Sequence, residues 1–247
     1  MEHPKTAFIT GASSGIGASF ARKLAEKGYD LALTARRHDK LESLAKTIKE
    51  KHNVKIELIK ADLSLADDVE RLSKYIKERA DISFLVNNAG FGTAGFFNTV
   101  DIGKSLSMIN VHAYAATALT HAALGNMIKN NSGAIINVSS MAGFIISPGS
   151  SVYHATKSYL NVFSACLAGE MQKIGADIKI QALCPGMTET EFFDTDEYRN
   201  KFDRTKVPRL MWMTADEVVG ISLKALESGK GCRDTGHREQ NIPRRNK

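Results

Sequence analysis

Near its amino end the chain reads Thr6-Ala7-Phe8-Ile9-Thr10-Gly11-Ala12-Ser13-Ser14-Gly15-Ile16-Gly17, and this stretch gives the clearest indication of its architecture. The first five residues form a short apolar run typical of a buried strand, and three glycines follow closely. Residues 19–27 then show helical spacing, with Phe20 and Leu24 on one face. The chain therefore opens with a predicted strand, a glycine-rich turn and a helix.

Glycines in such a turn let the backbone bend tightly and approach a diphosphate, which the following helix attracts through its free N–H groups and its dipole. The spacing here is Gly-x-x-x-Gly-x-Gly rather than the more familiar Gly-x-Gly-x-x-Gly. A plain strand-to-helix connection explains this spacing equally well. On its own, the turn leaves both interpretations open.

Buried strands and helices alternate along the rest of the chain. We expect strands at 31–34, 55–60, 82–87, 134–139 and 179–184, and helices at 39–51, 66–79, 104–129 and 153–174. This alternation predicts an α/β fold: a single-domain, Rossmann-type doubly wound parallel sheet with helices on both faces. Ligands of such folds bind beyond the carboxyl ends of the strands.

The predicted domain covers residues 1–230, and residues 231–247 are expected to form a basic, polar C-terminal tail. The longest region outside the alternation is 186–215, a candidate substrate loop or lid. Residues 226–238 contain no apolar run that could form a seventh strand and complete the sheet. Either the sheet stops at about six strands, or an unfavourable sequence is held there by its context.

Composition excludes several classes of protein. With 43% hydrophobic and 24% charged residues the chain reads as a soluble globular protein, and no apolar run reaches the ~18 residues of a membrane span. Three cysteines without Cys-x-x-Cys spacing and seven scattered histidines predict neither disulfides nor a metal site. With no export signal, we expect a cytoplasmic protein. The net charge of +6 is better explained by the basic tail than by nucleic-acid binding.

Tyr153 and Lys157 stand four residues apart, which places them on one face of a helix. A phenol titrates near pH ~10, and a neighbouring ammonium lowers its pKa. Lowering that pKa by roughly three units needs about 4 kcal/mol, so a second positive charge, such as an oxidised nicotinamide ring, would have to help. An amphipathic helix with a half-buried Tyr and a solvated Lys also accounts for the pair.

Other short motifs accompany this pair in a characteristic order. From Lys5 to about Gly229 the sequence resembles the classical short-chain dehydrogenases/reductases. Its motifs occur in the order and spacing of that family, with Ser140 thirteen residues before Tyr153. The matching motifs are the glycine-rich turn, Asn87-Asn88-Ala89-Gly90, Asn110, Ser140, Tyr153, Lys157 and Pro185-Gly186.

The resemblance implies a role for each of four catalytic residues. Tyr153 would donate a proton to a carbonyl during reduction and take it back during oxidation, while Lys157 would lower its pKa and bind the nicotinamide ribose. Ser140 would hydrogen-bond the substrate oxygen where negative charge develops. Asn110 would hold a water that links Lys157 to solvent. Taken singly, Ser140 also fits a polar strand end and Asn110 a helix start, and His154 is expected to point away and have no role.

The resemblance also implies the cofactor. Where NAD-using relatives carry an acidic residue after the second strand, this chain has Ala35, Arg36 and Arg37, which favours the 2′-phosphate of NADP(H) over NAD(H). A solvated loop next to Asp39 is the alternative explanation. The expected cofactor-binding residues are Gly11, Ser13, Ser14, Gly15, Ile16, Gly17, Arg36, Arg37, Asp62, Leu63, Asn88, Ala89, Gly90, Tyr153, Lys157, Pro185, Gly186, Thr188 and Thr190.

Two functional hypotheses follow. The first is an NADP(H)-dependent carbonyl reductase or alcohol dehydrogenase acting on a small molecule, and the second is a non-catalytic NADP(H)-binding sensor that regulates a partner. A sensor would have little reason to keep all four catalytic residues. Apolar residues such as Phe91, Phe96, Phe97, Phe144 and Ile146 fit an apolar substrate pocket and an ordinary core equally well. We expect no nucleic acid and no membrane partner.

The sequence also bears on how subunits assemble. The resemblance implies a homodimer or homotetramer, in which two helices of each subunit pack against a neighbour. The helices in question carry Ala115, Ala118 and Ala122, and Phe163 and Leu167. Their apolar faces are equally typical of core stripes.

Overall fold

A parallel sheet forms the middle layer of the computed structural model, which describes residues 5–195, 197–199, 202–228 and 233–234. The strand order is β3-β2-β1-β4-β5-β6-β9, so the order reverses between β1 and β4. Every pair in the sheet is parallel. Its strands are β1 Thr6–Thr10, β2 Asp30–Ala35, β3 Ile56–Lys60, β4 Ile82–Asn87, β5 Gly133–Val138, β6 Ile178–Cys184 and β9 Arg233–Asp234.

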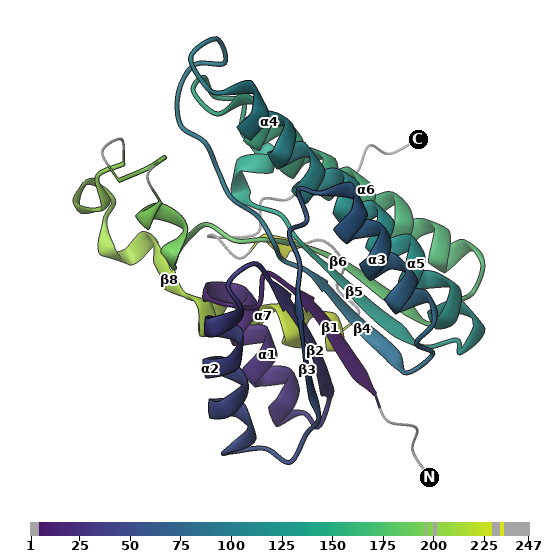
Figure 1. Ribbon diagram of the computed structural model, residues 1–247. Coiled ribbons are helices and arrows are strands. Elements are labelled where there is room, and N and C mark those ends of the chain that lie inside the picture. Colours follow the sequence, from purple (N-terminus) through teal and green to yellow (C-terminus); the bar gives the residue numbers. More distant parts are fainter. Residues whose placement is uncertain (1–4, 196, 200–201, 229–232, 235–247) are drawn as a thin grey trace.

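Helices cover both faces of this sheet, as Figure 1 shows. Successive side chains of a strand point to opposite faces of the sheet and pack in two separate cores. Ile9 packs with the helices of one layer and Phe8 with those of the other. The doubly wound α/β prediction is therefore confirmed. One layer contains α1 Gly15–Glu26, α2 His38–Lys49 and α7 Ala215–Glu227, and the other α3 Ala66–Lys77, α4 Ile102–Ile109, α5 Ala116–Lys129 and α6 Ser151–Lys173.

Burial on both faces fixes the carboxyl ends of the strands. All five residues of β1 are buried, and each fully buried large apolar side chain contributes about 1.5–3 kcal/mol. Because these strands are parallel, their carboxyl ends lie at one edge of the sheet. The last residues of β1, β2, β4 and β5 are Thr10, Ala35, Asn87 and Val138. The predicted site residues follow these ends.

Helix α7 and several boundaries differ from the sequence prediction. No helix was predicted for Ala215–Glu227, where Thr214 and Glu217 form a capping box. The helix expected at 104–129 contains three parts, because a π-helical stretch, η1 Asn110–Ala115, separates α4 from α5. Such π-helical turns occur frequently at functional sites. Asn110 is the first residue of this one.

The sheet has a seventh strand despite its unfavourable sequence. Arg233 and Asp234 pair in parallel with Leu183 and Cys184 of β6. Of the two alternatives, a sequence held by its context is therefore the correct one. The other residues of the predicted tail lie outside the described part of the chain, and the division into 1–230 and 231–247 stays a prediction.

The segment 186–215 projects beyond the carboxyl edge of the sheet, in yellow-green in Figure 1. We call it the substrate segment. Two short strands, β7 Met187–Glu189 and β8 Trp212–Thr214, pair in parallel at its two ends. The described residues between them form three 3-10 turns, η3 Glu191–Asp194, η4 Arg204–Lys206 and η5 Arg209–Met211.

Within the described residues, no helix combines the length and the apolar character that crossing a membrane requires. The same residues contain no cluster of three histidine, cysteine or acidic side chains suited to a metal ion.

Candidate active site

The glycine-rich turn packs directly against the stretch that follows β4. Gly11 has a φ of +63°, and a Cβ on it would lie 2.8 Å from the Cα of Ala89. Asn88 reaches across, where its Nδ2 donates to the carbonyl oxygens of Thr10 at 2.9 Å and Gly11 at 3.0 Å. The Asn88-Ala89-Gly90 stretch is thereby held against the turn at the point where the strand order reverses.

The amino end of α1 has the features of an anion site. The helix starts at Gly15, and the side chain of its N-cap residue, Ser14, makes no capping hydrogen bond to the first turn. A Cβ on Gly17 would overlap the carbonyl oxygen of Gly11 and lie 2.5 Å from Asn88 Nδ2, so only glycine fits there. Uncapped N–H groups beside a close-packed backbone fit a diphosphate.

Two arginines at the end of β2 lie beside this turn. The Arg36 side chain is 70% exposed, with its Nη1 4.0 Å from Asp62 Oδ2. The guanidinium of Arg37 donates to the hydroxyls of Ser13 at 3.1 Å and Ser14 at 2.9 Å. Basic groups and hydroxyls thus gather on one side of the turn, as a 2′-phosphate requires.

Three of the four predicted catalytic residues come together beyond β5. Ser140 follows the last residue of that strand, Val138, by two positions and caps the 3-10 turn η2 Met141–Phe144, where its hydroxyl accepts the Ala142 N–H at 3.1 Å. Tyr153 and Lys157 lie in the first two turns of α6, and the Lys157 Nζ is 5.7 Å from the centroid of the Tyr153 ring. The Ser140 side chain lies close enough to the Tyr153 hydroxyl to lower its pKa.

The acidity of Tyr153 differs from the sequence expectation. Burial raises the pKa of Tyr153 to about 12, and Ser140 only partly opposes this. In the protein alone the pKa of Tyr153 is therefore not lowered overall, because removing the phenolate from water costs more than its neighbours return; the lowering by Lys157 stays a prediction. The phenol carries its proton throughout the neutral range.

Lys157 is buried and held by main-chain groups. Its Nζ donates to the carbonyl oxygen of Val138 at 2.8 Å, and Ser139 Oγ donates to the carbonyl oxygen of Lys157 at 2.8 Å. Burial lowers the pKa of Lys157 to about 8. The ammonium is thus mostly charged at pH 7 and becomes neutral as the pH rises through about 8.

Asn110 lies on the π-helical stretch and faces a different partner. Its Nδ2 donates to the carbonyl oxygen of Ser64 at 3.1 Å. Among the described residues no direct hydrogen bond joins Asn110 to Lys157. A water between the two, as the resemblance implies, stays a prediction.

Sequence reasoning missed His112, which is completely buried behind Tyr153. The Phe91 N–H donates to His112 Nε2 at 3.1 Å, and this assigns the ring proton to Nδ1, which lies 2.9 Å from Thr156 Oγ1. The Thr156 hydroxyl in turn donates to the carbonyl oxygen of Tyr153 at 3.0 Å. Desolvation, and secondly Lys157, hold the pKa of His112 well below its usual value. His112 therefore joins the turn after β4 to the catalytic helix as a neutral ring.

No sequence signal pointed to His112, because its partner Phe91 lies far away in the sequence.

The expectation that His154 points away from the site is modified by the structure. Its Nδ1 lies 2.8 Å from the carbonyl oxygen of Ala142 and 2.7 Å from that of Ile145. His154 thus holds the 141–146 turn.

The remaining predicted cofactor residues lie along the same edge. Asp62 accepts hydrogen bonds from the N–H and hydroxyl of Ser64, and Thr188 donates to the carbonyl oxygen of Gly186 at 3.1 Å. A Cβ on Gly15 would lie 2.9 Å from Thr190 Cγ2, which brings the substrate segment against the start of α1. Leu63 is buried, Ile16 half-buried, and the carbonyl oxygen of Pro185 accepts the N–H of Met141.

Apolar residues at this edge divide between core and surface. Phe91 packs against the core, but Phe96, Phe97, Phe144 and Ile146 are exposed. They therefore do not belong to the core, which leaves them available around the site. Phe192 of the substrate segment lies against Tyr153, with ring centroids 5.7 Å apart.

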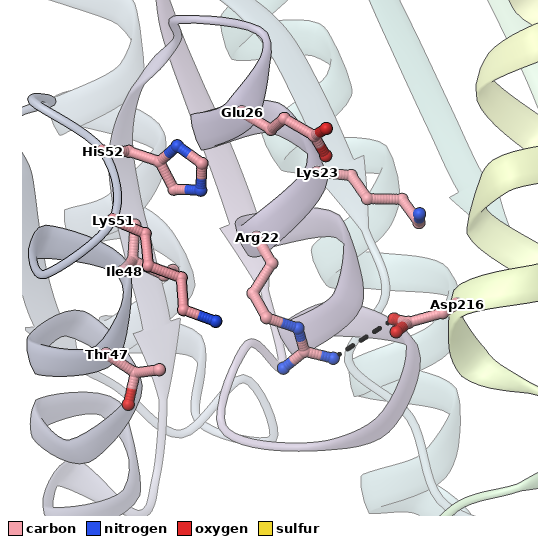
Figure 2. A pocket seen from close by; sticks show the side chains of 8 residues that line it. All are labelled: Arg22, Lys23, Glu26, Thr47, Ile48, Lys51, His52 and Asp216. Carbon is pink, nitrogen blue, oxygen red and sulfur yellow. Dashed lines mark hydrogen bonds and ion pairs between the residues drawn. The ribbon is translucent and has the colours of Figure 1, made fainter.

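A cavity of about 220 Å³ lies elsewhere, between the ends of α1 and α2. Figure 2 shows its charged lining, including Arg22, which forms an ion pair with Asp216 at 3.2 Å. None of the predicted site residues lines it. We assign the chemistry to the carboxyl edge of the sheet, because the glycine-rich turn and the buried titratable groups lie there.

These features place the chain in the class of dinucleotide-binding α/β proteins, and comparison with known proteins gives the family. The family model for short chain dehydrogenases matches residues 5–200. The chain belongs to this family of oxidoreductases, so the resemblance seen in the sequence is confirmed.

Individual relatives and structures agree with this family. The very-long-chain 3-oxoacyl-CoA reductase of Rattus norvegicus is 31% identical over 235 residues, which cover 94% of this chain and 70% of the relative. The NADP-dependent 3-hydroxy acid dehydrogenase of Schizosaccharomyces pombe is 38% identical over 192 residues, covering 76% and 73%. A short-chain dehydrogenase from Sphingobium yanoikuyae in complex with NADPH superimposes with a TM-score of 0.85 at 33% identity, covering 92% of this chain and 86% of the other.

Proposed function

We propose that the protein is an NADP(H)-dependent oxidoreductase that interconverts a carbonyl compound and a secondary alcohol. The observation that carries this proposal is the meeting of Ser140, Tyr153 and Lys157 beside the glycine-rich turn. Such a site brings a proton donor, an oxygen-binding hydroxyl and a buried cation next to a place for a dinucleotide. The full set also favours an enzyme over a non-catalytic sensor.

The nicotinamide, when bound, supplies or accepts the hydride. The protein's own residues hold the substrate oxygen and move a proton. During reduction, Tyr153 Oη donates its proton to the substrate oxygen as negative charge develops there, and the Ser140 hydroxyl stabilises that charge by a hydrogen bond. Lys157 keeps a positive charge next to the phenol, which favours the phenolate that remains.

The pKa of about 12 makes Tyr153 a proton donor in the free protein. Oxidation of an alcohol needs the opposite step, in which the phenolate accepts a proton. A positive charge added nearby would lower the pKa of Tyr153 toward the neutral range, and an oxidised nicotinamide carries such a charge. The two forms of the cofactor would thus favour the two directions of proton transfer.

NADP(H) is the proposed cofactor because Arg36 and Arg37 lie beside the turn and no carboxylate follows β2 directly. The 3-hydroxy acid dehydrogenase and the NADPH complex named above support this choice. The adenine ring is proposed to lie near Asp62 and Leu63.

Replacing Arg36 with Ala should weaken NADPH binding about tenfold and change NADH binding by less than about twofold, because the proposed partner of the guanidinium is the 2′-phosphate, which NADH lacks. Titration calorimetry with both dinucleotides measures the two effects. Lys46→Ala, at the far end of α2, removes an equal charge and is the matched control. Equal weakening of NADPH and NADH by Arg36→Ala would contradict the assignment.

The proposed substrate is an apolar carbonyl compound or alcohol. Phe192 lies next to the reactive phenol, while Phe144, Ile145 and Ile146 are exposed after Ser140. These side chains offer apolar surface around the position of the substrate oxygen. The rat relative is named for an acyl thioester with a long chain, which agrees with this character.

The enzyme proposal predicts oxidation of NADPH, followed by its absorbance, with at least one member of a panel of ketones, aldehydes and 3-oxoacyl thioesters. A panel that varies the apolar chain length tests the substrate class at the same time. Tight NADPH binding without turnover of any compound would instead favour the sensor.

We also propose that two copies associate. Leu106 and Ile109 on α4 and Val162 on α6 are exposed, whereas Ala115 of η1, Ala122 of α5 and Leu167 of α6 are buried in the core. Exposed apolar side chains on these helices support a homodimer or homotetramer. Sedimentation velocity measures the state, and a monomer at micromolar concentration would exclude it. A cytoplasmic location stays a proposal.

A further inference from the structure

Glu191, the first residue of η3, forms ion pairs across the glycine-rich turn to the layer of α2. Its Oε1 lies 2.6 Å from Lys40 Nζ and its Oε2 lies 2.7 Å from Arg37 Nη1. Lys40, and secondly Arg37, lower the pKa of Glu191 to about 2. The carboxylate is therefore charged throughout the physiological range.

Arg37, one of these two cations, lies at the proposed position of the 2′-phosphate, and Lys40 is joined to it through Glu191. Arg37 donates at once to Glu191 and to the hydroxyls of Ser13 and Ser14, which belong to the turn itself. Lys40 lies in the first turn of α2, three residues after Arg37, which is the N-cap residue of that helix. A carboxylate and a phosphate use the same kind of donor, so these groups cannot bind both anions fully at one time.

We propose that Glu191 is a resident competitor of the 2′-phosphate, so that its ion pairs with Arg37 and Lys40 open when NADP(H) binds. This inference rests on the proposed function. It makes Glu191 a determinant of cofactor affinity that acts against NADP(H) and leaves NAD(H) unaffected. A phosphate prevails in this competition because it carries more charge and more acceptor oxygens than a carboxylate.

The competition reaches the catalytic residues through the next position in the chain. Phe192 contacts the Tyr153 ring, and it also lies 5.4 Å from the Tyr198 ring, measured between centroids. Phe193 packs edge-on against Trp212 at 5.6 Å. Release of Glu191 would therefore disturb the aromatic group that lies over the phenol. Trp212 is the single tryptophan of the chain, so its fluorescence reports on this group.

The test uses adenosine 2′,5′-bisphosphate, which carries the 2′-phosphate but no nicotinamide, and titration calorimetry. Glu191→Gln should bind it about five- to tenfold more tightly than the wild type, because the competing charge is gone. Binding of 5′-AMP should not change. Glu189→Gln is the matched control, since Glu189 pairs at 3.5 Å with Arg209 instead, and it should bind the bisphosphate as the wild type does.

Fluorescence gives a second measurement on the same proteins. Adding the bisphosphate to the wild type should shift the emission of Trp212, and Glu191→Gln should show part of that shift without ligand. Unchanged or weaker bisphosphate binding by Glu191→Gln would overturn the competition, and weaker binding would show that Glu191 closes over the bound cofactor. A wild type that binds neither NADPH nor the bisphosphate would overturn the cofactor assignment itself.

Discussion

Tyr153→Phe should lower kcat for reduction about 10³-fold while NADPH binding stays within about twofold of the wild type. The substitution removes only the hydroxyl that faces Ser140, and the ring keeps its contacts with Phe192 and His112. The proton route is lost while the shape of the site remains. Steady-state kinetics with any ketone that the wild type reduces, together with NADPH titration, measure the two effects.

Tyr159→Phe is the matched control on the same helix. Its hydroxyl lies 2.7 Å from Thr117 Oγ1 at the exposed side of α6, away from Ser140. This variant should keep the wild-type kcat within about twofold. If Tyr153→Phe retained most of its rate, another group would have to supply the proton, and the role assigned to Tyr153 would be wrong.

Gly17→Ala should weaken binding of NADPH and NADH alike, by roughly 100-fold, and lower the free energy of unfolding by about 1–3 kcal/mol. A Cβ there overlaps a backbone oxygen, that of Gly11, and backbone cannot move aside as a flexible side chain does. The turn would have to shift away from Asn88. Dinucleotide titration and thermal unfolding measure both consequences.

Gly125→Ala offers the contrasting control. Gly125 lies inside α5, and a Cβ on it would meet nothing within 4 Å. Alanine there should stabilise the protein by about 0.4–1 kcal/mol and leave dinucleotide binding unchanged. Normal NADPH affinity in Gly17→Ala would show that the turn tolerates a side chain and that its close packing is not what forms the site.

Much of the architecture could be predicted because strands buried on both faces give continuous apolar runs. Thr6–Thr10 and Ile82–Asn87 are of this kind, and their order with the helices implies the parallel sheet. The strand Arg233–Asp234 could not be predicted, because two polar residues give no apolar run. Pairing with Leu183 and Cys184 supplies its backbone partners, which composition does not reveal.

The order of the motifs was enough to predict that Ser140, Tyr153 and Lys157 lie together. Ser140 follows the end of a strand, and the other two residues lie on one face of a helix. The acidity of Tyr153 could not be predicted, because it depends on how much water the fold excludes. Contacts between distant positions were equally invisible: Glu191 lies 151 residues from Lys40 along the chain. Helical spacing alone could not show that the segment after β7 reaches back to α2.

The π-helical turn at Asn110–Ala115 makes the protein sensitive to the length of that region. Each residue of an ordinary helix turns the chain by about 100°. Deleting one residue there would give a regular helix and swing α4, with the loop before it, by roughly that angle relative to α5. Homologues that are shorter by a single position in this helix would have to present a different face to the dinucleotide.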